Sequence, residues 1–473
     1  MLINTKNLSL LRIINVLFCL FPISFILGSL IVTTNIYLFL ILCIFYINKK
    51  KYKFNLDHTN ITLICFFLII IISSLINIES IKYGFALKSI LLFRFALLYL
   101  IVETLLLNND LNLKKFFITS LLCTSFVSFD LIFQYIFGYN VFGQTNPNIE
   151  LTGVTGAFGN EAIVGGYIRK FLLFSIFGFL FLFEKNHKKN LLLFILVLLH
   201  LTAVFVANNK ISMVVLFCSL ILLLLMNKQA RLVIATSLIA FVAVAAILLN
   251  SDDQLKKRYQ YFYERFLTES VEVSVDLEAQ NKLENKKTTT TKKIYIYNSH
   301  HVGIFFAAVE SWKDNPILGW GHKSFRTKCY DVLQNIVKFN LRCATHPHNY
   351  HLEILHDYGL VGFILISTFV FMTLFKILKR LKNRKLHNKV YFMYFIPVVI
   401  IVLAEVWPIK SSGSLFTTWN GTFVWLTIAL SAIVKKDFIK KNLNFPIKNR
   451  GVLVLSFSTV LVASLLIKRL YLI

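Results

Sequence analysis

The sequence is poor in charged residues, and most of those present carry one sign. Only 15% of the 473 residues are charged, with 23 Asp and Glu against 50 Lys and Arg, whereas 57% are hydrophobic. A soluble protein of this length does not need so much apolar surface. A backbone within a bilayer must satisfy its own hydrogen bonds, and no strand pattern stands out. We therefore expect an all-α polytopic membrane protein.

The net charge of +27 would suggest nucleic acid as a partner in a soluble chain. Here most Lys and Arg stand in short blocks between apolar runs, so an inside-positive orientation explains them and no nucleic-acid partner is expected. The N-terminus resembles a signal peptide, with Lys6 and Arg12 in its charged region. No small-residue cleavage site follows, and we interpret the run as a retained first span.

Apolar runs long enough to cross a bilayer predict about 12–13 transmembrane helices. The first two are separated by a hairpin near 28–34. The runs are 11–29, 30–47, 60–78, 88–107, 116–137, 164–183, 190–207, 211–226, 231–249, 359–378, 390–407, 413–434 and 451–467.

The basic blocks fall in alternate loops, so the intervening loops should lie outside. This predicts N-terminal spans over 1–249, one large periplasmic loop over 250–358 and C-terminal spans over 359–473. Within the loop, 252–268 has the spacing of an amphipathic surface helix, and the polar, low-complexity 278–293 is predicted to be a mobile connector. A second outer segment, 138–164, is predicted to re-enter near the membrane.

The densest group of reactive side chains is the stretch THPHNYHLEILHDYG at 345–359. Asn349 can cap a helix that begins here, which leaves His348 just ahead of the helix N-terminus. The positive end of the helix dipole disfavours imidazolium, and a neutral imidazole is what a general base needs. His348 is the candidate base. The alternative is a polar residue satisfied at a helix start, and Glu353 and Asp357 either orient a reacting group or form a solvated face.

The sequence lacks the patterns of a zinc site. His346, His348 and His351 do not form HExxH, and no cysteine pair at zinc spacing accompanies them, so we expect neither metal nor cofactor. Five cysteines lie in apolar runs and are interpreted as packing residues. Cys329 and Cys343 bracket a short outer segment, and we expect a disulfide between them.

Ionisable residues inside apolar runs are costly and call for a partner or a function. Arg169 and Lys210 lie at the depth of the histidine stretch, where two cations could hold a lipid-linked diphosphate. For Arg94 and Asp130 we favour snorkelling or a buried ion pair.

Two stretches resemble the outer-loop signature of the bacterial O-antigen ligase and O-antigen polymerase superfamily. These are NPILGWGHKSF, and HPHNYHLEILHDYGLVG after it. An earlier segment, GAFGNEAIVGGYIR, resembles the one that ends in the family's membrane arginine. The resemblance implies that His348 is the essential histidine and Arg169 a diphosphate contact. Lys210 and His301 fall where many members carry arginine. Arg326, His346 and Asn349 complete the expected substrate-binding set.

The resemblance also implies a metal-independent glycosyltransferase in the bacterial inner membrane, with its active site on the periplasmic side. The expected donor is an undecaprenyl-diphosphate-linked glycan, and membrane lipids surround the protein. A ligase would use a lipid A-core acceptor, which we favour. A polymerase would use a second carrier-linked glycan. A transporter is the more distant alternative, but its usual internal repeats are not seen.

Overall fold

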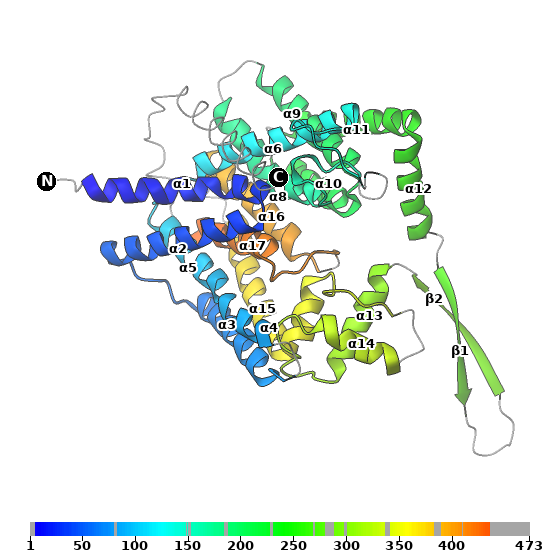
Figure 1. Ribbon diagram of the computed structural model, residues 1–473. Coiled ribbons are helices and arrows are strands. Elements are labelled where there is room, and N and C mark those ends of the chain that lie inside the picture. Colours follow the sequence, from blue (N-terminus) through cyan, green and yellow to red (C-terminus); the bar gives the residue numbers. More distant parts are fainter. Residues whose placement is uncertain are drawn as a thin grey trace.

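The computed structural model describes residues 5–435, except 80–82, 148, 150–152, 184–187, 228–229, 268–269, 280–287, 298–299, 336–340, 383–388 and 409. Figure 1 shows a bundle of helices with a single protruding β-hairpin. The N-terminal helices are α1 (Thr5–Leu27), α2 (Ser29–Lys50), α3 (His58–Ile76), α4 (Tyr83–Leu91), α5 (Phe93–Leu107) and α6 (Leu113–Phe137). After the short η1 (Gly156–Phe158) come α8 (Val164–Leu182), α9 (Lys189–Val206), α10 (Lys210–Met226), α11 (Arg231–Ser251) and α12 (Asp253–Leu267).

The second half of the chain begins with the hairpin, β1 (Ser270–Ala279) and β2 (Thr288–Tyr297). The remaining elements are α13 (His300–Lys313), α14 (Phe325–Asn335), α15 (Tyr350–Lys382), α16 (Lys389–Val406), α17 (Thr418–Leu430) and η3 (Ser431–Lys435). In Figure 1, α13 and α14 lie beside the end of α15 that is nearer its N-terminus. They enclose a small apolar core of their own, which includes Ile304, Phe325 and Cys329.

The described helices confirm a multi-pass membrane protein. Within the described residues, nine helices are long and apolar enough to cross a bilayer, and two shorter apolar helices cover 210–226 and 393–406. The break between the first two spans is confirmed, because α1 ends at Leu27 and Gly28 adopts a positive φ of 107°, but α2 begins at Ser29, so the predicted turn over 28–34 is too long. The predicted run 451–467 lies outside the described residues.

Aromatic side chains fill the centre of the bundle. Phe25 makes edge-to-face contacts with Phe171, Trp419 and Phe423, so α1, α8 and α17 meet at one cluster. Gly178 allows α8 to approach α6 closely, because a Cβ there would collide with the backbone of Phe117. Phe171 also contacts Phe423 directly, with the ring centroids 5.2 Å apart, which joins α8 to α17.

The segment 138–158 folds onto the C-terminal end of α6. The side-chain carbonyl of Gln134 accepts hydrogen bonds from the backbone of Thr155 at 2.9 Å and of Gly156 at 2.7 Å. Asp130 accepts from the backbone N–H of Val141 at 2.8 Å. Arg94 donates instead to Thr418 Oγ1 at 3.1 Å, so the predicted alternative of an Arg94–Asp130 pair is wrong. A loop amide, that of Val141, therefore takes the place of a cation at Asp130 Oδ1.

Beyond α11 the chain departs in part from expectation. The amphipathic helix is present as α12, but we expected no strands, and β1 and β2 form an antiparallel pair from Ser270↔Tyr297 to Ala279↔Thr288. SVEVSVDLEA alternates apolar and polar residues, which is the strand period. The predicted connector 278–293 is therefore wrong where it overlaps the strands, and 280–287 lies outside the described residues.

Candidate active site

The site is built around a break in α15. Gly359 has φ 63° and ψ −166°, which interrupts the helix and frees backbone groups on both sides of it. The loop 316–321 takes up these groups: Leu360 N donates to Pro316 O at 2.9 Å, and Gly321 N donates to Asp357 O at 2.7 Å. The backbone pairing fixes the loop to the helix that follows the histidine stretch.

Two glycines make this contact possible. Gly319 has φ 67°, and a Cβ built on it would lie 2.5 Å from the backbone nitrogens of Tyr358 and Gly359. A Cβ on Gly359 would collide with the backbone of Ile317. Both positions therefore exclude a side chain by backbone conformation and by space. This explains in physical terms why Gly319 of PILGWG and Gly359 of HDYG face each other.

Asn349 caps the N-terminus of α15, as the sequence predicts. Its Oδ1 accepts hydrogen bonds from the backbone of His351 at 2.9 Å and of Leu352 at 3.1 Å. Its Nδ2 donates to the carbonyls of Pro408 at 2.6 Å and Lys410 at 3.3 Å. One side chain thus both starts the helix and joins it to the segment after α16.

His348 immediately precedes this cap in a constrained backbone conformation. Its φ is 55°, which is uncommon for a residue with a side chain, and its carbonyl accepts from Ser412 N at 2.7 Å. Such conformations are retained where the surrounding structure fixes them, and they concentrate at functional sites.

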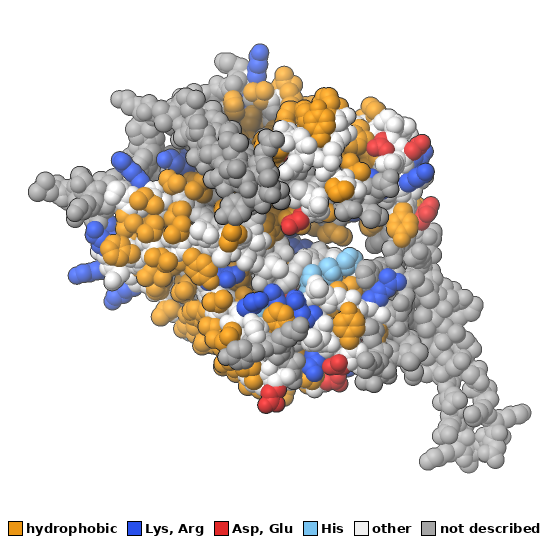
Figure 2. All heavy atoms as spheres, viewed as in Figure 1, with side chains coloured by type: hydrophobic (Ala, Val, Ile, Leu, Met, Phe, Trp, Pro, Cys, Tyr) orange, Lys and Arg blue, Asp and Glu red, His pale blue; other side chains and the backbone are white. Residues whose placement is uncertain are grey.

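Three imidazoles lie together here. The ring centroid of His348 is 4.1 Å from that of His346 and 5.0 Å from that of His301. Burial lowers the pKa of His346 below its usual value, which favours a neutral ring. Figure 2 shows histidine side chains at the edge of a hollow in the molecular surface, with Lys and Arg side chains beside it. Within the part of the chain described, no group of three or more His, Cys, Asp and Glu is arranged to hold a metal ion.

Glu353 and Asp357 are buried, so the solvated-face interpretation of this pair is wrong. Glu353 accepts hydrogen bonds from the Ser414 hydroxyl and from Leu415 N, the latter at 2.8 Å. Asp357 accepts from Lys323 N at 2.9 Å and from Ser324 Oγ at 3.0 Å. Each carboxylate fastens α15 to a different loop.

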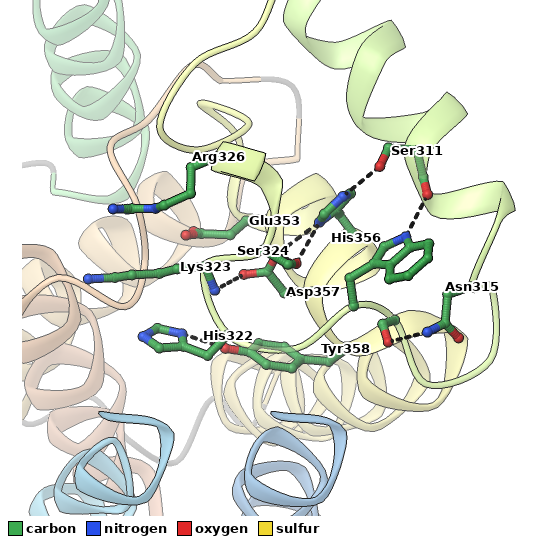
Figure 3. A network of polar contacts seen from close by, with 12 residues as sticks. Ser311, Asn315, His322, Lys323, Ser324, Arg326, Glu353, His356, Asp357 and Tyr358 are labelled. Atoms are coloured by element: carbon green, nitrogen blue, oxygen red, sulfur yellow. Dashed lines mark hydrogen bonds and ion pairs between the residues drawn. The ribbon is translucent and has the colours of Figure 1, made fainter. Parts of the chain in front are cut away.

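His356 extends this network, as Figure 3 shows. Its Nδ1 lies 2.8 Å from Asp357 Oδ1, and its Nε2 lies 3.0 Å from Ser311 Oγ. Nothing in the sequence distinguishes His356 from the neighbouring histidines. All three side chains are almost fully buried, so this Ser–His–Asp arrangement ties α13 to α15 and does not face a substrate.

Arg169 belongs to a buried charge cluster. Its Nη1 lies 2.7 Å from Glu405 Oε1, and the same carboxylate lies 3.5 Å from Lys170 Nζ and 2.8 Å from Lys410 Nζ. Three cations share one carboxylate, which leaves excess positive charge. Lys410 Nζ also lies 5.3 Å from the ring centroid of Tyr350 in the first turn of α15. We call Arg169, Lys170, Lys410 and Glu405 the Glu405 cluster. It therefore adjoins the histidine stretch.

The sequence prediction missed Lys170, Glu405 and Lys410. The available signal was Glu405, a carboxylate inside the apolar run 390–407, because such a group requires buried partners. Burial lowers the pKa of Lys410 to about 8, although its pair with Glu405 acts in the opposite direction.

Lys210 begins α10, and its Nζ lies 5.7 Å from the ring centroids of both Tyr259 and Phe262 on α12. The adjacent Asn209 touches Gly165, one turn before Arg169 on α8. The structure thus brings the starts of α8 and α10 together, with α12 over Lys210. It gives no contact between Lys210 and the Glu405 cluster.

Cys329 and Cys343 are joined by a disulfide with their Cα atoms 5.7 Å apart. The disulfide connects α14 to the segment that immediately precedes the histidine stretch. Arg326, one turn before Cys329, has its Nη2 3.5 Å from Thr345 O. Disulfide and arginine thus approach the histidine stretch from the same side.

Residues 192–367 match the family model described as O-antigen ligase (Wzy_C). The matched region runs from α9 to just beyond the break in α15, and so includes His301, Arg326 and the whole histidine stretch. No curated protein matches the chain. The match shows that this part of the chain is a domain of the O-antigen ligase family, which also includes O-antigen polymerases.

Proposed function

With an O-antigen ligase domain over residues 192–367 as the premise, we propose that the protein is a ligase. It would transfer a glycan from an undecaprenyl diphosphate carrier to a hydroxyl of a lipid A-core acceptor. An O-antigen polymerase, with a second carrier-linked glycan as acceptor, is the alternative. PILGWG and HPHN lie in one large loop towards the C-terminal half of the chain. This arrangement resembles that of the family's ligases, and we therefore favour the ligase.

The observation that carries the proposal is the meeting of the histidines with the Glu405 cluster. Asn349 follows His348 directly and donates to the carbonyl of Lys410, whose ammonium contacts Glu405 at 2.8 Å. A base for a hydroxyl and cations for a diphosphate thus stand on adjoining segments. A glycosyl transfer from a diphosphate needs both at one place.

In the proposed reaction the acceptor oxygen attacks the anomeric carbon, and the bond from that carbon to the carrier diphosphate breaks. His348 accepts the hydroxyl proton, and the diphosphate departs with the bonding electron pair. Arg169 and Lys410 stabilise its charge, while Glu405 holds the two cations in place before the donor arrives. Direct displacement implies inversion at the anomeric carbon. No metal or cofactor is needed for this scheme.

We further propose that the segment 250–358 faces the periplasm and that the protein lies in the inner membrane. The support is the alternation of basic blocks along the sequence. A cysteine introduced at Thr289, in β2, should react with a membrane-impermeant thiol reagent in intact spheroplasts. Labelling only after lysis would place this segment on the cytoplasmic side and refute the proposed topology.

The function is tested by incubating purified protein with an undecaprenyl-diphosphate glycan and either lipid A-core or a second carrier-linked glycan. We expect transfer to lipid A-core, and His348→Ala should lower it by about 10²–10⁴-fold. His351→Ala is the matched control, since His351 Nε2 lies 3.2 Å from the carbonyl of Val406 in the same stretch. His346→Ala should cost much less than His348→Ala. Full activity of His348→Ala would refute the assignment, and product only from the second carrier-linked glycan would favour the polymerase.

A further inference from the structure

A second group of cations surrounds the ring of Phe85 in α4. Lys88 Nζ lies 5.5 Å from its centroid, Lys323 Nζ lies 5.9 Å from it, and Arg326 Cζ lies 4.7 Å from it. We call Lys88, Lys323 and Arg326 the Phe85 cluster. Lys88 comes from α4, Lys323 from the loop that leads into α14 and Arg326 from the first turn of α14, so the cluster joins segments that are far apart in the sequence. The fold therefore brings like charges together at one aromatic surface.

Within the described residues, no carboxylate forms an ion pair with the Phe85 cluster. The two nearby acidic groups are used elsewhere: Glu353 accepts from Ser414 and Leu415, and Asp357 accepts from Ser324 and from the backbone of Lys323. In the Glu405 cluster, by contrast, the Glu405 carboxylate forms ion pairs with Arg169 and Lys410. The face of the Phe85 ring offsets part of the repulsion among the three cations.

Arg326 carries the clearest sign of a missing ligand. Its Nε is buried and has no hydrogen-bond partner among the described residues, and the hydrogen bond from its Nη2 to Thr345 O is long at 3.5 Å. A guanidinium that presents unused donors beside two ammonium groups suits an oxyanion that can accept several hydrogen bonds. Figure 3 shows Arg326, Lys323 and His322 extending in the same direction, away from the buried His356 network. Burial lowers the pKa of His322 to about 3, and the three neighbouring cations act in the same direction.

The Phe85 cluster and the Glu405 cluster approach the histidine stretch at different ends. Arg326 contacts the carbonyl of Thr345, three residues before His348, whereas Lys410 contacts Asn349 and Tyr350, just after it. A single diphosphate needs only one of these groups. Two separate cation clusters on either side of the proposed base imply two anionic substrates.

We propose that the Phe85 cluster is a subsite for the acceptor and binds a phosphate group that the acceptor carries. This inference rests on the proposed function, since it assigns the second substrate of the same site. The Glu405 cluster holds the donor diphosphate, and the Phe85 cluster holds the acceptor phosphate. The acceptor hydroxyl is thereby directed to His348 between them.

The test uses a lipid-anchored oligosaccharide with a phosphate monoester and the same compound after phosphatase treatment. In zwitterionic nanodiscs, Arg326→Gln and Lys323→Gln should each raise the KM for the phosphorylated acceptor about tenfold and leave the donor KM unchanged. With the dephosphorylated acceptor, variants and wild type should agree within about twofold. Lys328→Gln is the matched control, because Lys328 lies on α14 near the Trp320 ring and already has Asp331 at 3.4 Å.

Equal KM values of the wild type for the two acceptors would overturn the proposal. A rise in donor KM in the Arg326 and Lys323 variants would assign the cluster to the donor and overturn it as well. A defect that is the same with both acceptors and depends on anionic lipid in the nanodisc would identify a lipid headgroup as the occupant. If the wild type transfers nothing, the proposed function fails, and direct binding of the two acceptors still tests the subsite. Preference for the phosphorylated one, lost in Arg326→Gln, would support it.

Discussion

Replacing Gly319 by alanine tests whether the contact between the 316–321 loop and the break in α15 supports the fold. Gly319 has φ +67°, and its new Cβ would lie 2.5 Å from two backbone nitrogens of the break. The left-handed conformation costs a residue with a side chain roughly 1–2 kcal/mol. Overpacking adds roughly 1–3 kcal/mol, because backbone atoms cannot rotate away. We expect Gly319→Ala to lose about 2–5 kcal/mol of stability.

The chain offers two glycines that separate these contributions. Gly138 has φ +80° and nothing within 4 Å of a built Cβ, so Gly138→Ala should show the conformational cost alone. Gly84 lies in α4 with open space and no positive φ, so Gly84→Ala should be neutral or gain roughly 0.5–1 kcal/mol. The difference between Gly319→Ala and Gly138→Ala is therefore the part due to close approach.

The assay is thermal unfolding of detergent-purified protein, followed by tryptophan fluorescence at one heating rate, because membrane proteins often unfold irreversibly. The expected order of Tm is Gly84→Ala at or above wild type, then Gly138→Ala, then Gly319→Ala. Transfer activity of folded Gly319→Ala should also fall, since the loop holds the helix that carries the histidine stretch. A Gly319→Ala protein as stable as Gly138→Ala would refute the argument that the two backbones exclude a Cβ.

Three further predictions concern charge, redox state and pH. Arg169→Ala and Lys210→Ala should each raise the donor KM and leave the protein folded, while Lys210→Arg should retain much of the activity. An unchanged donor KM in both alanine variants would show that neither residue binds the donor. Mass spectrometry of unreduced protein should show the Cys329–Cys343 linkage, and two free thiols would contradict it. Cys329→Ser should lower the free energy of unfolding by about 3 kcal/mol, because the unfolded chain regains the entropy of the closed loop. Burial depresses the pKa of His322, so the folded protein favours the neutral ring. The free energy of unfolding should therefore fall as the pH is lowered from about 6.5 towards 3, by up to about 1.4 kcal/mol per pH unit. His322→Gln should flatten this acid-side loss, and an unchanged pH profile in that variant would contradict the prediction.

The sequence predicted best those features that depend on neighbours along the chain. Asn349 could be recognised as a cap because the cap needs only the next few residues, and its bonds to His351 and Leu352 are present. The membrane spans were recognisable for the same reason, since length and hydropathy are local. The β-hairpin was missed although the alternation of β1 is also local, because the Thr- and Lys-rich composition of 288–293 is equally typical of a polar linker.

The charge clusters could not be predicted in this way, because each joins segments that are distant in sequence. Glu405 in α16 is an example: it lies in an apolar run, so it must be neutralised, but nothing local says that its partners are Arg169 and Lys170 on α8 together with Lys410. The same carboxylate explains why these cations can stand close together before any substrate binds. It follows that Glu405→Gln should not simply weaken donor binding: without its charge, repulsion among the three buried cations should destabilise the empty protein, and a bound diphosphate should restore part of that stability.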